Sequence, residues 1–165
     1  MSRSFDDDLL APELTEADDA VGFDQPWNPW SLVTLTFFFG LLAGGSLLAL
    51  NFERLGMPGR RVPVLGLVIG VTTLIIAGTA WAAGSGGLAA GNPTQRQLWR
   101  WGVRALSVLI AMAIAAPQQK RWRLFQVSGL PAGKLLWPAV AACAVALAYE
   151  LVWAAVISPL IFFRR

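Results

Sequence analysis

The stretch NPWSLVTLTFFFGLLAGGSLLALNFERLG, residues 28–56, determines how this chain begins its fold. It contains an apolar run over 30–50, and about 20 such residues cross a bilayer core as a helix. Asn28 is a good helix cap, and Pro29 suits the first helical position, where a missing N–H costs nothing. The stretch therefore predicts a membrane helix that begins at Asn28-Pro29, with Trp27 and Trp30 at the level of the lipid headgroups.

Three further apolar runs follow this stretch, over 62–83, 101–116 and 135–158. They are rich in Leu, Ala, Gly and Val and show no polar alternation, which favours helices over barrel strands. The third run is short for a span, and the fourth is long enough to tilt. We predict an all-α integral membrane protein with four transmembrane helices in one membrane domain, residues 26–165. Four spans would put both termini on one side.

The charged side chains are segregated along the chain. Residues 1–25 hold eight of the ten acids, and this composition predicts a flexible acidic tail. Residues 26–165 hold twelve bases but only two acids, Glu53 and Glu150. The bases fall in short groups between apolar runs, which is typical of a protein partnered by a lipid bilayer and not of one that binds nucleic acid. We expect a bacterial cytoplasmic membrane.

The loop charges leave the orientation in that membrane undecided. The first and third loops carry seven bases and the opposite side six, a weak preference for termini outside. The absence of an export signal ahead of the tail favours the other orientation. The third loop, 117–134, fits either a short interfacial helix or an irregular segment.

Small residues spaced by four occur in the first two runs. Gly40 and Gly44 form one pair, and Gly66 and Gly70 form another. This spacing places small residues on one helix face, where two backbones can approach closely. We interpret the two pairs as the contact between spans one and two, packed as a tight hairpin; the alternative is a face for another subunit.

Glu150 is the single acid inside an apolar run. Such a group usually faces protein or water, because an ionised side chain in the bilayer is costly. Arg104 lies 13 residues before Pro117, and Glu150 lies 14 residues after Leu136, so both sit roughly 20 Å from the loop side that they share. If spans three and four are neighbours, we predict an Arg104–Glu150 ion pair. The alternative is a proton or cation site at Glu150.

Most tryptophans lie near the ends of predicted spans, where indole settles at the membrane interface. The predicted interfacial anchors are Trp27, Trp30, Trp99, Trp101, Trp122 and Trp137. Histidine is absent, and neither a nucleophile–base pair nor a phosphate-binding glycine motif is present. We therefore expect no enzyme activity, no catalytic residue, no metal and no cofactor.

Residues 28–56 resemble the opening of a group of bacterial multi-span membrane proteins of unknown function. The shared features are Asn-Pro-Trp before the first span, an aromatic-Gly-x-x-Ala-Gly-Gly centre, and Asn-x-x-Arg-Leu-Gly after it. RWRLFQVSGLPAGKLLWPA, residues 121–139, is similar to their loop before the last span. The resemblance implies a bacterial multi-span protein and no particular activity.

The function that these features favour is a non-catalytic accessory, structural or assembly subunit of a larger membrane complex, whether respiratory, photosynthetic or for transport. Chemistry is lacking, while small-residue faces and a charged tail suit docking. The alternative is a small transporter or channel, acting as a homo-oligomer, with Glu150 in the pathway.

Overall fold

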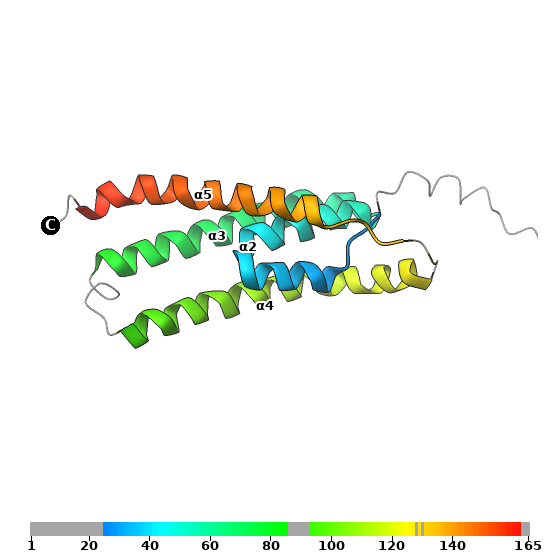
Figure 1. Ribbon diagram of the computed structural model, residues 1–165, viewed down its shortest axis with the longest axis horizontal. Coiled ribbons are helices and arrows are strands. Elements are labelled where there is room, and N and C mark those ends of the chain that lie inside the picture. Colours follow the sequence, from blue (N-terminus) through cyan, green and yellow to red (C-terminus); the bar gives the residue numbers. More distant parts are fainter. Residues whose placement is uncertain (1–24, 86–92, 128, 130, 163–165) are drawn as a thin grey trace, which may run out of the picture.

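The computed structural model describes residues 25–85, 93–127, 129 and 131–162. The predicted acidic tail lies outside these residues, apart from Gln25. The described elements, in chain order, are α2 (Pro29–Arg54), the short 3-10 helix η2 (Pro58–Arg60), α3 (Arg61–Gly84), α4 (Pro93–Val127) and α5 (Leu136–Phe162) (Figure 1). Four of them are long and apolar enough to cross a membrane, which confirms the predicted all-α membrane class.

Helix α2 does not run straight but doubles back at Gly40 (Figure 1). The backbone N–H of Trp27 donates to Asn51 Oδ1 at 2.8 Å, although residues 24 positions apart in a straight helix lie about 36 Å apart. A guanidinium N–H of Arg54 likewise donates to the carbonyl of Gln25 at 3.0 Å. We call residues 29–39 the first arm, residues 41–54 the second arm, and the two together the hairpin.

Two glycines make the reversal possible. Gly40 has φ 86° and ψ 170°, a region that is essentially open only to glycine. At Gly44 the arms touch backbone to backbone, since a Cβ there would lie 2.6 Å from the nitrogen of Thr36 and 2.7 Å from the carbonyl oxygen of Leu32. Gly40 therefore provides the turn of the hairpin, and Gly44 allows its arms to close.

A buried amide pair holds the base of the hairpin. The Asn51 side chain accepts from the Trp27 N–H and donates to the Trp27 carbonyl at 3.0 Å, so it bridges the two arms. It also donates to Gln118 Oε1 of α4 at 2.8 Å, and Gln118 Nε2 donates to the Leu48 carbonyl at 2.9 Å. Both amide side chains are fully buried. Because buried polar groups stabilise only when they are satisfied, this network fixes both the hairpin and its attachment to α4.

The hairpin forms the centre of the molecule, and α3, α4 and α5 pack around it (Figure 1). Its apolar side chains, among them Leu32, Leu48 and Phe52, are among the most deeply buried of the described residues. Helices α4 and α5 make at most marginal contact with each other within the described residues. The predicted Arg104–Glu150 pair required spans three and four to be neighbours, and this condition is not met because the hairpin lies between them.

Helix α4 continues well beyond the predicted span 101–116. It runs through Pro117 to Val127, so neither the flat interfacial helix nor the irregular loop expected after residue 117 forms there. The reason is tertiary contact: Gln118 and Trp122, one turn apart, are both buried. Arg121, on the same segment, donates to the carbonyls of Leu55 and Gly56, each at 2.9 Å. Contacts with the base of the hairpin thus stabilise the continuation of α4 beyond residue 116.

The path of α2 changes the topology of the chain. The hairpin begins and ends toward one end of the molecule, and α3, α4 and α5 then each run between that end and the other (Figure 1). Gln25 consequently lies at the end opposite to the last turn of α5 (Figure 1). The expectation that both termini lie on one side does not hold for the described residues, because it assumed a straight first span.

Candidate functional site

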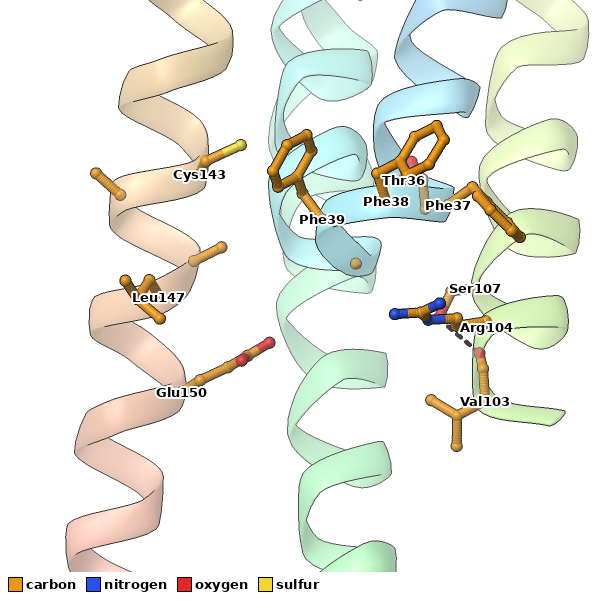
Figure 2. Close-up of a pocket in the computed structure, with 13 residues that line it drawn as sticks. Thr36, Phe37, Phe38, Phe39, Val103, Arg104, Ser107, Cys143, Leu147 and Glu150 are labelled. Carbon is orange, nitrogen blue, oxygen red and sulfur yellow. Dashed lines mark hydrogen bonds between the residues drawn. The ribbon is translucent and has the colours of Figure 1, made fainter. Parts of the chain in front are cut away.

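A pocket of about 530 Å³ lies directly beyond the tip of the hairpin (Figure 2). Its walls come from the tip itself, from α4 and from α5. The lining side chains are Thr36, Phe37, Phe38, Phe39, Val103, Arg104, Ser107, Cys143, Ala144, Ala146, Leu147 and Glu150, together with Gly40. The first arm has 11 residues and is therefore about 16 Å long, roughly half of a bilayer core. With the hairpin base at the membrane interface, an arm of this length would put the pocket near the middle of the bilayer.

Arg104 and Glu150 point toward each other across this pocket from α4 and α5 (Figure 2). Counting residues from the loop side correctly predicted that both side chains face the same pocket. They do not form the predicted direct ion pair, however; within the described residues the ion pair that forms joins Arg61 and Glu53. The physical reason is the fold, because the hairpin keeps α4 and α5 apart.

Aromatic rings hold the Arg104 guanidinium. Its central carbon lies 5.7 Å from the ring centre of Trp101 and 6.0 Å from that of Phe37, distances at which a cation is attracted to a ring face. The neighbouring polar groups are already engaged. The Ser107 hydroxyl donates to the Val103 carbonyl at 2.8 Å, and the Thr36 hydroxyl donates to the Leu32 carbonyl at 3.1 Å. Arg104 and Glu150 are therefore the charged groups that the pocket offers to a ligand.

A second pocket, of about 500 Å³, lies along the first turns of α4 and shares Arg104 with the first. It is lined by Arg96, Arg100 and Arg104, which recur every four residues and so lie on one helix face. Gln97 and Trp101 complete its polar and aromatic lining. Through Arg104 the second pocket adjoins the first, and its other lining residues belong to the beginning of α4.

The tip also presents the ends of two helices to the first pocket. The first arm stops at residue 39 and the second starts at residue 41, on either side of non-helical Gly40. The last carbonyls of the first arm and the first N–H groups of the second lack partners within their own arms. Non-helical backbone at membrane depth is tolerated only where it is buried in protein or lines a water-filled cavity. The pocket therefore fits a hydrated space.

The two predicted glycine pairs have separate roles. Gly40 and Gly44 shape the hairpin, as described above, and do not form a flat packing face. Gly66 and Gly70 of α3 are exposed, and a Cβ at either position would meet no atom within 4 Å. The hairpin instead contacts α3 at Gly45, where a Cβ would lie 2.8 Å from a Val68 methyl. Spans one and two do pack together, but the predicted Gly66–Gly70 pair takes no part in the contact.

Two of the six predicted tryptophan anchors are buried in the protein. Trp27 is 2% exposed, and the central carbon of the Arg54 guanidinium lies 3.8 Å from the centre of the Trp27 ring. Trp122 is 8% exposed and stacks on Phe125 at 5.6 Å. The reason is that both indoles pack at the hairpin base, which the sequence pattern placed in loops. The other four anchors are exposed, namely Trp30, Trp99, Trp101 and Trp137.

Sequence reasoning missed the residues that support the pocket from behind. Asn51 and Gln118 end two apolar runs, and a buried carboxamide just beyond a membrane run is a signal for an internal hydrogen bond. The Tyr149 hydroxyl of α5 lies 2.6 Å from that of Thr73 in α3. These contacts fix α3, α4 and α5 around the hairpin and so set the shape of the pocket.

No protein-family model, no curated protein and no solved structure matches the chain. The described residues bring together no group of three or more His, Cys, Asp or Glu side chains that could hold a metal ion. The geometry of the hairpin-tip pocket is therefore what supports a function.

Proposed function

We propose that this chain is a membrane transport protein that admits a small polar solute to the pocket beyond the hairpin tip. The observation that carries the proposal is the meeting of Arg104, Glu150 and the non-helical turn at Gly40 around one space. Each charged group would cost about 2.5–3.5 kcal/mol in lipid on insertion scales, so such groups normally face protein or water. A hydrated pocket accounts for both charges and for the interrupted backbone.

We infer that the solute enters this pocket from one side. The arginine-lined second pocket, at the beginning of α4, shares Arg104 with it, while the hairpin and its buried Asn51–Gln118 pair lie on the other side. This arrangement corresponds to a site open to one side of the membrane. Broken helices that meet at a midplane site are a recurring feature of transporters.

A second subunit would complete such a site. Because α4 and α5 scarcely touch, the pocket lacks a helix–helix seam between the two walls that carry Arg104 and Glu150. We infer that the working unit is a homo-oligomer or a complex in which another chain covers this side. The bacterial cytoplasmic membrane is the location that we propose.

The hydrated pocket is tested with the native thiol of Cys143, which lines it. We expect a small water-soluble methanethiosulfonate reagent to label Cys143 in intact membranes. The matched control is Val145→Cys in a Cys143→Ala background, because Val145 is on the same helix, is exposed and does not line the pocket. Equal failure of both thiols to react would overturn the proposal. Glu150→Gln should then reduce solute flux in reconstituted liposomes.

The second candidate is the non-catalytic accessory or assembly subunit. The observation that favours it is the exposed Gly66–Gly70 face of α3, where a helix of another protein could approach closely. Purification in mild detergent followed by native mass spectrometry separates the two candidates. An accessory subunit should retain a different protein at fixed stoichiometry, and Gly70→Leu should release it. A transporter should appear alone, as a homo-oligomer.

A further inference from the structure

We propose that the hairpin-tip pocket binds a small zwitterion, with its anionic group at Arg104 and its ammonium group at Glu150. This inference rests on the proposed function, since it names the class of solute that the pocket admits. A zwitterion is a ligand that carries both charges a few ångströms apart, as an amino acid or an aminophosphate lipid headgroup does. Arg104 and Glu150 match that pattern because they face each other across the pocket without pairing directly (Figure 2).

The Arg104 side of the pocket is suited to a carboxylate or a phosphate. The guanidinium presents a planar set of N–H donors, which binds such groups in a two-pronged manner. The ring centres of Trp101 and Phe37 lie 5.7 and 6.0 Å from the central carbon of the guanidinium and restrict the position of this group. Within the described residues, no acidic side chain lines the pocket that contains Arg100 and Arg104. An anionic group entering from the beginning of α4 therefore meets the guanidinium groups of Arg100 and Arg104.

The Glu150 side is suited to an ammonium group. Its carboxylate points into the pocket, and no hydrogen bond or ion pair to it is seen within the described part of the chain (Figure 2). A carboxylate accepts up to several N–H bonds, and an ammonium group supplies three. The carbonyls at the end of the first arm add acceptors near the tip, and the first N–H groups of the second arm add donors.

The remaining walls are apolar and suit a hydrocarbon side chain between the two charges. Phe39 and Leu147 lie between the hairpin and α5 (Figure 2), and Ala144 and Ala146 also line the pocket. The pocket volume of about 530 Å³ falls within the range of about 300–1,000 Å³ that is usual for small-molecule sites. A zwitterion with an aliphatic side chain fits this combination of groups better than an inorganic ion does.

Three probes of one shape test the inference. Leucine carries both charges, 4-methylpentanoate lacks the ammonium group, and 3-methylbutylamine lacks the carboxylate. We expect leucine to bind the detergent-purified full chain roughly ten- to a hundredfold more tightly than either analogue, because each lost contact is a charge-assisted hydrogen bond. Binding is measured by calorimetry and by the shift in melting temperature.

Two variants assign the charges. In Arg104→Gln, leucine should lose its advantage over 3-methylbutylamine but keep its advantage over 4-methylpentanoate. In Glu150→Gln the pattern should reverse. This crossed pattern cannot arise from a general loss of folding, which would weaken all three probes alike. A water-bridged structural pair, by contrast, would leave all probes without effect and would lower the melting temperature in both variants.

A second arm distinguishes the two sources of a zwitterion. Full-length protein is placed in phosphatidylcholine nanodiscs with and without phosphatidylethanolamine, whose headgroup carries a free ammonium. Stabilisation by phosphatidylethanolamine that disappears in Glu150→Gln would assign the ligand to the lipid and support the inference. If neither leucine nor this lipid binds better than the single-charge probes, the inference is overturned. Labelling of Cys143 decides the proposed function separately, since a hydrated pocket without zwitterion preference contradicts only the ligand class.

Discussion

Helices α2 and α5 have the same mean hydropathy and similar lengths, yet they occupy opposite places in the molecule. The apolar window of α2 is 61% buried in the protein, and that of α5 is 6% buried. The difference lies in a few residues. Helix α2 carries Gly40 and Gly44, which allow it to turn and close, and its Asn51 binds the backbone of Trp27, just before the helix. Helix α5 has no glycine, so it runs straight.

Mean hydropathy therefore measures whether a segment tolerates lipid, and does not determine the path that the segment takes. In α5, apolar side chains such as Val145 and Leu151 are exposed on the protein surface, where lipid can cover them. In α2, similar side chains face the other three long helices and form the core. A membrane protein with so few helices thus gains an interior by folding one of its apolar segments in half.

The largest expected effect concerns the side of the membrane reached by the chain before α2. In a Cys143→Ala background, Gln25→Cys and Gly59→Cys should react with an impermeant thiol reagent from the same side. Ser85→Cys should react only from the other side, because α3 separates it from Gly59. The outcome is all or none. If Gln25→Cys instead reacts together with Ser85→Cys, α2 crosses the membrane like α5 and the comparison fails.

The same experiment gives the orientation. Seven bases lie at the end of the molecule that contains the hairpin base: Arg54, Arg60, Arg61, Lys120, Arg121, Arg123 and Lys134. Because α2 doubles back at Gly40, the chain before α2 also lies at this basic end. The positive-inside rule then predicts that this end of the molecule, with Gln25, faces the cytoplasm. Gln25→Cys should therefore react only after the membrane is permeabilised.

A Cβ at Gly44 should open the hairpin. Gly44→Ala places a methyl against backbone atoms of Thr36 and Leu32, which cannot move without separating the arms. We expect a loss of about 3 kcal/mol or more in the free energy of unfolding in mixed micelles. Gly70→Ala is the control: its Cβ meets no atom within 4 Å, and alanine favours a helix by up to about 1 kcal/mol. Equal effects of the two substitutions would contradict the close contact of the arms.

Much of the fold is predictable from the sequence, because membrane helices depend on local composition. The apolar runs and the start at Asn28-Pro29 are of this kind: Asn28 Oδ1 accepts from the Trp30 N–H at 3.0 Å, and Pro29 occupies the first turn. The reversal at Gly40 is not predictable in this way. A glycine within an apolar run looks the same in the sequence whether its helix runs straight or reverses there. The contact of Asn51 with Trp27 distinguishes the reversed path from the straight one.

The site was predictable to a similar degree. Counting residues from the shared loop correctly put Arg104 and Glu150 at one depth, because the rise per residue in a helix is constant. The gap between them depends on which helices are neighbours, and this follows from long-range contacts such as Asn51–Gln118, 67 residues apart. No local sequence feature of Asn51 or Gln118 indicates that the other is its partner.

Loss of the amide bridge should have an intermediate effect. Asn51→Leu leaves the Trp27 N–H and Gln118 Oε1 without this buried partner, and each such group costs about 1–3 kcal/mol. We expect unfolding to become easier by about 2–3 kcal/mol. Gln118→Leu alone should also destabilise, but Asn51→Leu with Gln118→Leu should cost clearly less than the sum of the two. Strict additivity in this double-mutant cycle would show that the amides do not act as one unit.

The smallest expected effect is at Arg121, where α4 is tied to the end of the second arm. Its guanidinium donates to the carbonyls of Leu55 and Gly56, which follow the helix and are otherwise left for water. Arg121 is exposed, so solvent replaces much of what Arg121→Gln removes, and we expect a loss of about 1 kcal/mol. Arg123→Gln changes the same charge two residues away, without a hydrogen bond to the hairpin in the described structure, and should change the free energy of unfolding by less than about 0.5 kcal/mol. If both variants lose the same amount, the effect is one of charge alone, and α4 extends past Pro117 through its apolar contacts rather than through Arg121.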